Sequence, residues 1–152
     1  MKNKFFELYK PKQLLEFLAF IKENPKEEIV YVLQQPATES RMIRNRHTGE
    51  SFEKKPPSIL SASDFGYLAF CLPESSQMIF SPTPFIHKMR KNLRDFKGTD
   101  YILCMGDPAI IGLSTAVVSD ITNGKFNLLK WDRQERRYYP LTFDLYAKGE
   151  LE

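Results

Sequence analysis

The segment from residue 84 to residue 97 carries the densest group of basic side chains in the sequence. Six basic residues fall within eleven positions there, opposed only by Asp95. They are His87, Lys88, Arg90, Lys91, Arg94 and Lys97. On one exposed surface, such Lys and Arg side chains can contact phosphates, and each contact adds affinity that weakens with salt. The alternative is an ordinary solvated helix face, because runs of charge are common on surfaces.

The polar segment 37–58 holds a second group of cations. Arg41, Arg44 and Arg46 fall within six positions, and the following His47-Thr48-Gly49-Glu50 is typical of the turn of a short β-hairpin. An arginine-rich hairpin can reach a nucleic acid or an acidic protein partner. Glutamates within the same segment dilute its positive field, so a solubilising loop is the alternative interpretation.

Gly106 and Asp107 occupy the turn between a predicted strand and a predicted helix. Ligands of open α/β sheets bind beyond the carboxyl ends of the strands, and the N–H groups of a helix N-terminus attract anions. Asp107 is itself an anion that suits a helix cap, with Pro108 at the first helical position. No phosphate-binding glycine motif surrounds the turn. The sequence therefore favours a structural cap, and a nucleotide or small-molecule site at Gly106 and Asp107 is the alternative.

No complete catalytic or metal-binding motif accompanies these groups. His47 and His87 have no Asp, Glu or Cys at ligand spacing. Ser114 lacks the glycines of a nucleophile elbow. Cys71 and Cys104 each lie in an apolar run, without the paired spacing of a zinc site or a disulfide framework. We expect no cofactor and no metal, and the sequence favours a non-enzymatic protein while leaving enzyme activity open.

Composition and charge set the class of protein. The chain has 152 residues, 42% of them apolar and 27% charged, which is typical of one soluble globular domain. Its net charge of +3 is mildly basic and below what a dedicated nucleic-acid binder usually carries. The polar N-terminus is unlike a signal peptide, and the longest apolar stretch, 109–118, is too short to cross a membrane. We expect a cytoplasmic protein with a single domain, 1–152, into which 37–58 is inserted.

The periodicity of apolar residues predicts the elements that must position these groups. Helices are expected over 10–23, 84–97 and 109–121, and strands over 28–34, 77–81, 101–105, 126–131 and 137–145. Residues 64–72 fit a short helix or a buried strand, and the Ser63-Asp64 cap together with Pro73 favours a helix. The basic segment has an apolar stripe at helical spacing, which should face the core and turn the cations toward solvent. The stripe consists of Phe85, Met89, Leu93 and Phe96.

The alternation of helices and strands predicts an α/β fold. We expect a small three-layer α/β/α domain with a mainly parallel sheet, whose crossovers are right-handed. The last strand should pair antiparallel with the strand before it and lie near an edge of the sheet, where Pro140 is tolerated. An exposed edge can recruit a second copy of the chain, so a homo-oligomer or an assembly role is a further alternative.

Two stretches in the last third of the chain resemble small proteins encoded by bacteriophages. They are G-D-P-A-I-I-G-L (106–113) and L-L-K-W-D-R-Q-E-R-R-Y-Y-P-L-T-F-D-L (128–145), and the likeness is confined to residues 100–145. The resemblance implies an accessory viral protein working in the host cytoplasm, and it carries over no functional residue. Our leading hypothesis is therefore a non-enzymatic binding or regulatory protein. It would contact nucleic acid or an acidic protein partner through the basic helix and the arginines of residues 41–46.

Overall fold

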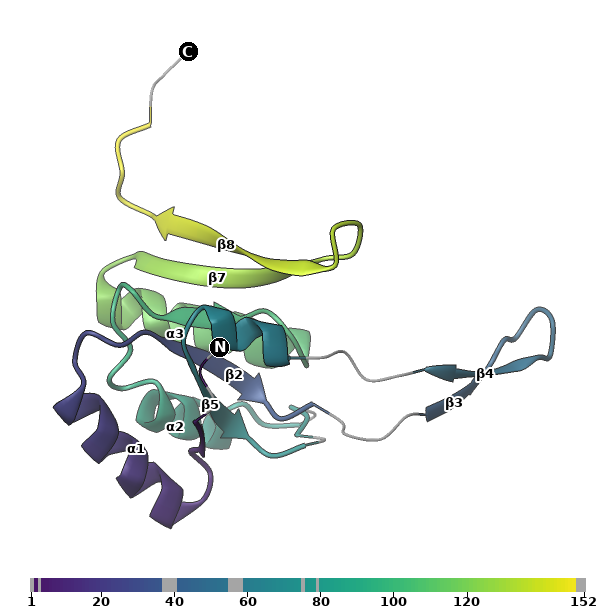
Figure 1. Ribbon diagram of the computed structural model, residues 1–152, viewed down its shortest axis with the longest axis horizontal. Helices are drawn as coiled ribbons and strands as arrows, with labels where there is room; N and C mark the ends of the chain where they lie inside the picture. The colour runs from purple at the N-terminus through teal and green to yellow at the C-terminus, as the bar shows by residue number, and fades with distance from the viewer. Residues whose placement is uncertain are drawn as a thin grey trace.

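The structure is a computed structural model that describes residues 2, 4–36, 41–54, 59–74, 76–78 and 80–149. Within them, a six-stranded sheet in the order β1-β5-β2-β6-β7-β8 forms the centre of the molecule (Figure 1). The strands are β1 (Phe5–Glu7), β2 (Ile29–Gln34), β5 (Tyr67–Leu72), β6 (Tyr101–Leu103), β7 (Lys125–Asp132) and β8 (Arg137–Asp144). All neighbouring strands pair in parallel except β7 and β8, which pair antiparallel. The prediction of a mainly parallel α/β sheet with an antiparallel C-terminal hairpin is confirmed.

The α-helices of the described residues all pack on one face of this sheet. They are α1 (Pro11–Glu23), α2 (Thr83–Asn92) and α3 (Pro108–Thr122). The other face is covered by the 3-10 helix η1 (Leu60–Asp64) and neighbouring loops. The connections that contain α1, α2 and α3 step in one direction along the sheet, whereas the connection from β2 to β5 steps back. Because crossovers are right-handed, the returning connection lies on the opposite face. Within the described residues, one covering layer therefore consists of three α-helices and the other of a short 3-10 helix and loops.

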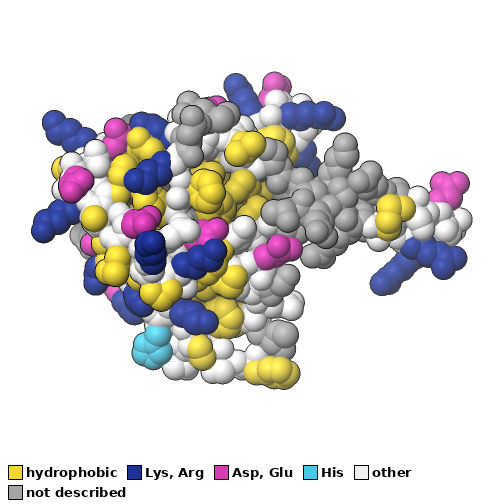
Figure 2. Space-filling model, turned by 60° about the horizontal axis from the view of Figure 1, so that its bottom comes forward, with side chains coloured by type: hydrophobic (Ala, Val, Ile, Leu, Met, Phe, Trp, Pro, Cys, Tyr) yellow, Lys and Arg dark blue, Asp and Glu magenta, His cyan; other side chains and the backbone are white. Residues whose placement is uncertain are grey.

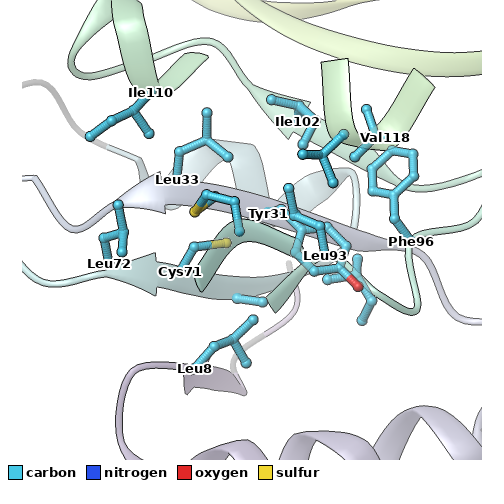
Figure 3. Packing of buried hydrophobic residues seen from close by; sticks show 14 of the residues in the cluster. Leu8, Tyr31, Leu33, Cys71, Leu72, Leu93, Phe96, Ile102, Ile110 and Val118 are labelled. Carbon is cyan, nitrogen blue, oxygen red and sulfur yellow. The ribbon is translucent and has the colours of Figure 1, made fainter. Parts of the chain in front are cut away.

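The larger core lies between the central strands and the three helices. Tyr31 and Leu33 of β2 and Ile102 of β6 are fully buried there. Figure 3 shows these side chains beside Leu93, which follows α2. Every residue of Ile29–Leu33 is buried, as is typical of a parallel strand that is covered on both faces.

The prediction of a helix over residues 64–72 is wrong, because this segment contains strand β5. β5 lies between β1 and β2, so Leu68 is buried on one face of the sheet and Ala69 on the other. A short apolar run of this kind carries no period that separates helix from strand. Gly66 precedes the strand, and a Cβ there would overlap the carbonyl oxygen of Glu28. A glycine in a strand pattern often marks such a close approach of two backbones.

Three other elements differ from the prediction. β1 is only three residues long, and no sequence pattern predicts it. The strand expected over 77–81 is not formed by the described residues of that segment. Helix α2 ends at Asn92 instead of continuing to 97. The Asn92 side-chain amide donates a 2.8 Å hydrogen bond to the carbonyl oxygen of Cys71, which ties the end of the helix to β5.

The strands β3 (Arg41–Arg44) and β4 (Ser51–Lys54) form the hairpin that the sequence predicts. They make a separate two-stranded sheet, and Figure 1 shows it projecting from the body of the molecule. Asn45 fixes the turn, because its Oδ1 accepts hydrogen bonds from the backbone N–H of His47 (2.9 Å) and Thr48 (3.3 Å). Gly49 completes the turn with a positive φ of 76°, which favours glycine.

Candidate functional site

The exposed side of α2 carries the predicted cations. Met89 is buried on the inner side of the helix, and Leu93 and Phe96 continue the buried stripe beyond its end. Lys88, Arg90, Lys91 and Arg94 are exposed, and we call these four the basic surface. Helix α2 contains no acidic residue. The structure therefore places Lys88, Arg90 and Lys91 on the solvent-exposed side of α2, with the exposed Arg94 two residues beyond its end.

The ion pairs of the basic surface are weak. Arg90 lies 3.4 Å from Asp120 of α3, and Arg94 lies 3.4 Å from Asp95. All four of these side chains are exposed, and such pairs contribute about 0–1 kcal/mol. The Lys88 ammonium is 5.7 Å from the centre of the Phe85 ring. These contacts leave the charges accessible to an external anion.

Lys97 does not belong to the basic surface. Its Nζ donates hydrogen bonds of 2.6 Å to the carbonyl oxygen of Glu27 and to Oδ1 of Asp100. Its side chain is 35% exposed, whereas Asp100 is 1% exposed. Lys97 instead ties the segment after α2 to the chain that enters β2. Its sequence spacing placed it on a helix that ends five residues earlier.

The amino-terminal end of α2 adds an exposed aromatic ring to this region. Pro82 is the N-cap, no side chain caps the helix, and the first turn contains no acidic residue. The positive end of the helix dipole is therefore not compensated by a carboxylate within the turn. Phe80 lies just before the helix and is 97% exposed. Phe80 is not among the residues predicted for a site because its segment is predicted as a strand, although Pro82 and Pro84 are signals against one.

The arginines of the hairpin lie on a separate element. Arg44 and Arg46 are exposed, and the side chain of Arg41 lies outside the described residues. On the face in Figure 2, Lys and Arg are spread among acidic and apolar side chains over the body, with further cations on the projecting hairpin. The hairpin arginines thus lie on the separate two-stranded sheet, whereas the basic surface is formed by α2 and the residues just after it.

At the carboxyl end of the sheet, the polar side chains at the predicted turn bind neighbouring backbone groups. The carboxylate of Asp107 accepts hydrogen bonds from the N–H of Ala109 (2.9 Å) and Met78 (3.0 Å). The Asp107 N–H donates to Oε1 of Gln34 (2.8 Å), and the amide of Gln34 donates to the carbonyl oxygen of Ser76 (2.9 Å). Gln34 ends β2, so these bonds join three segments. They support the interpretation of Asp107 as a structural cap.

Gly106 is required by the same arrangement. Its φ is +110°, a conformation that other residues rarely adopt. A Cβ there would lie 2.5 Å from Oε1 of Gln34. The Gln34 side chain therefore lies directly against the backbone of the turn.

At the amino end of the sheet, a cavity of about 480 Å³ lies between α1 and the segment that follows α2. It is lined by Leu18, Ile21, Lys22, Asn24, Pro25, Ile29, Tyr31, Arg94, Asp95, Lys97 and Asp100. Only Arg94 and Lys97 were candidate site residues in the sequence. The lining comes from positions far apart in the chain, so no local motif could have predicted it.

Asp100 is the most buried charged group beside this cavity. Its Oδ1 accepts hydrogen bonds from the Ile29 N–H (2.9 Å) and from Lys97 Nζ, and its Oδ2 accepts from the Lys97 N–H (3.0 Å). Burial raises the pKa of Asp100, and the hydrogen bonds from Lys97 oppose this rise. Burial and the nearby Asp100 charge raise the pKa of Tyr31 well above its ordinary value, so its hydroxyl stays protonated. No group of three or more His, Cys, Asp or Glu suited to a metal occurs among the described residues.

The fold and these sites define a small α/β protein with a parallel-sheet core and a basic helix surface. The sequence model of the phage Pam3 gp32-like proteins matches residues 28–145, and the chain belongs to this family. The match extends the likeness to phage proteins well beyond residues 100–145. No curated protein and no solved structure matches the chain. Within the described part of the chain, none of the helices has the length and apolar character needed to span a membrane.

Proposed function

We propose that this phage-family protein is a non-enzymatic accessory protein that binds nucleic acid in the host cytoplasm through the basic surface of α2. The observation that carries the proposal is the asymmetry of this helix. Met89 anchors its inner side in the core, while the outer side presents Lys88, Arg90 and Lys91 without an acidic residue in the helix. Cations held at fixed spacing on a packed helix can contact successive phosphates of a backbone.

The amino-terminal end of the helix supports the same function. Backbone N–H groups at an uncapped helix end favour a phosphate. Phe80 adds an exposed ring just before the first turn of α2. Bases stack on exposed aromatic side chains when proteins bind single strands. We therefore expect Phe80 to increase the affinity for a single-stranded oligonucleotide more than for a duplex.

The hairpin supplies a second group of phosphate contacts in this proposal. Arg44 and Arg46 are exposed on an element that projects from the body, and Arg41 begins its first strand. Two separate groups of cations lengthen the stretch of backbone that a protein can neutralise, and the salt dependence of binding increases with each contact.

Fluorescence anisotropy with a labelled oligonucleotide at low salt tests the proposal. The test variant replaces Lys88, Arg90, Lys91 and Arg94 with Ala. The matched control replaces four exposed lysines elsewhere, Lys12, Lys26, Lys125 and Lys148, and so removes the same charge. We expect the test variant to lose most of its affinity and to reduce the slope of log K against log salt by about 3. The control variant should keep the affinity and the salt slope of the wild type.

Two results would contradict the proposal. One is the absence of binding by the wild-type chain at micromolar concentration and low salt. The other is an equal loss of affinity in the test and control variants, which would mean that net charge alone attracts the oligonucleotide. If the basic surface instead binds an acidic protein, an acidic polypeptide such as polyglutamate will bind the wild type and the oligonucleotide will not.

A further inference from the structure

The cavity at the amino end of the sheet has the dimensions of a small-molecule site. Its volume of about 480 Å³ falls within the range of about 300–1,000 Å³ that is usual for ligand pockets. It lies at the end of the sheet opposite to Gly106 and Asp107, because Ile29 begins β2 and Asp100 directly precedes β6. It is therefore distinct from the ligand site that the sequence suggests.

Tyr31 gives this cavity a polar group that makes no hydrogen bond within the described part of the fold. The residue is fully buried, and its hydroxyl has no hydrogen-bond partner among the described residues. Leaving a buried hydroxyl unsatisfied costs about 1–3 kcal/mol, so such a group calls for an explanation. Tyr31 lines the cavity together with Asp95 and Asp100, and both carboxylates act on its hydroxyl. Tyr31 lines the cavity, and its hydroxyl is protonated and able to donate.

The remaining polar groups of the cavity are also mainly donors. The Asp100 carboxylate already accepts three hydrogen bonds. The Lys97 ammonium donates to Glu27 and Asp100, which leaves one of its three protons. The exposed Arg94 has further N–H groups beyond its contact with Asp95. A ligand that satisfies this site must supply acceptors, and three lining cations against two lining carboxylates favour a negative charge.

The other part of the lining is apolar. Leu18 and Ile21 of α1 contribute aliphatic side chains, and Pro25 and Ile29 extend this surface along the chain that enters β2. Ligand pockets combine such a surface with a few polar groups that orient the ligand. The cavity therefore combines an apolar wall for the body of a ligand with donors for an anionic group.

We propose that this cavity binds a small organic anion, in which a flat apolar body carries a single carboxylate or phosphate group. The Tyr31 hydroxyl and Lys97 ammonium donate to the anionic group, and Leu18 and Ile21 pack on the apolar body. The site shares Arg94 with the basic surface of α2, but its ligand is a small molecule, and its occupancy does not depend on nucleic-acid binding.

Titration with the fluorescent anion 8-anilinonaphthalene-1-sulfonate tests this site in the full chain. We expect one probe to bind per chain. Competition with 2-naphthoate and with 2-naphthyl phosphate then shows whether a carboxylate or a phosphate is preferred. Tyr31→Phe removes only the unsatisfied hydroxyl, and the loss of a hydrogen bond to a charged group should weaken binding about tenfold or more. Ile21→Trp fills the apolar part and should weaken binding at least as much.

Two further variants serve as controls. Lys88→Ala removes a cation of α2 outside the cavity, and Phe80→Ser removes the most exposed aromatic ring, to which the probe could adhere. Both should bind the probe as the wild type does. Absence of binding, or wild-type affinity in both Tyr31→Phe and Ile21→Trp, would overturn the proposal, and so would loss of binding in Phe80→Ser. Circular dichroism establishes that each variant is folded, and if Ile21→Trp is not, Tyr31→Phe decides.

Discussion

The two ends of the parallel sheet differ in whether their polar side chains use all of their hydrogen-bonding groups within the fold. At the carboxyl end, Gln34 and Asp107 bind the backbone of neighbouring segments with both their donors and their acceptors. At the amino end, Asp100 and Lys97 join segments in the same way. The Tyr31 hydroxyl, on a residue that lines the cavity, has no hydrogen-bond partner in the described part of the chain. A ligand site requires polar groups whose hydrogen bonds are not all made within the fold, and Tyr31 is such a group at the amino end.

The topology of the sheet nevertheless predicts a ligand site at the carboxyl end. The connection after β2 leaves in one direction and the connection after its neighbour β6 leaves in the other. A divergence of this kind opens the crevice in which α/β proteins usually bind ligands. Here the Gln34 side chain lies in that place, against Gly106.

The largest loss of unfolding free energy at either end should come from Asp100→Ala at the amino end. Removing one partner of a buried ion pair costs about 3–5 kcal/mol, and we expect about 3 because Lys97 is 35% exposed. The Ile29 N–H loses its acceptor as well. Urea unfolding measures the change, with the exposed Asp95→Ala as the control, which should alter stability by less than about 0.5 kcal/mol. An equal effect of both substitutions would show that the buried pair does not stabilise this end.

A smaller effect is expected for Gly106→Ala at the carboxyl end. A positive φ at a residue other than glycine costs about 1–3 kcal/mol, and the new methyl group would also displace Gln34. We expect a loss of about 2 kcal/mol in thermal or urea unfolding. Gly112→Ala in α3 is the matched control, because no atom lies within 4 Å of its Cβ position. It should stabilise the helix by up to about 1 kcal/mol, and a stabilising Gly106→Ala would contradict the proposed packing of Gln34.

Asp107→Ala should have a smaller effect again. The substitution removes the N-cap of α3 and the acceptor of the Met78 N–H, and loss of a cap costs about 0.5–2 kcal/mol. Asp107→Asn retains an oxygen for the Ala109 N–H and should lose about half as much. If Asp107 bound a ligand instead of capping the helix, Asp107→Ala would leave the unfolding free energy of the isolated chain unchanged.

The smallest effect is a dependence of the unfolding free energy on pH, caused by Asp100 at the amino end. Because the pKa of Asp100 is raised in the folded chain, the native state binds this proton more tightly than the unfolded state does. The stability that comes from this tighter proton binding is fully present below the unfolded pKa of Asp100 and is lost as pH rises through its folded pKa. Lowering the pH from 7 toward 4 should therefore increase the unfolding free energy of the wild type relative to Asp100→Asn. A change in the opposite direction would mean that the bonds from Lys97 outweigh burial.

Local patterns in the sequence predicted much of the fold and little of the amino-end cavity. The apolar stripe that includes Met89 predicted the exposed side of α2, and the capping role of Asp107 followed from its position before Pro108. Strand β5 was missed because it is buried on both faces and so shows no alternation. Lys97 was assigned to the basic helix because its spacing continues the helical pattern, whereas contact with Asp100 takes it out of that surface.

The cavity could not be predicted from the sequence for a different reason. Its lining runs from Leu18 to Asp100 and is assembled only when α1 and the segment after α2 pack on the same face of the sheet. The signal that identifies it is the unsatisfied Tyr31 hydroxyl, which is a property of packing. In the sequence, Tyr31 is one aromatic residue within an apolar strand.

The contrast between the two ends is tested most directly by nuclear magnetic resonance of the ¹⁵N-labelled chain titrated with 8-anilinonaphthalene-1-sulfonate. We expect the backbone amide signals of Asn24, Ile29 and Lys97 to shift together with probe concentration. The signals of Gly106 and Asp107 should stay in place. Shifts that gather at Gly106 and Asp107, with the amino-end signals unchanged, would contradict this expectation.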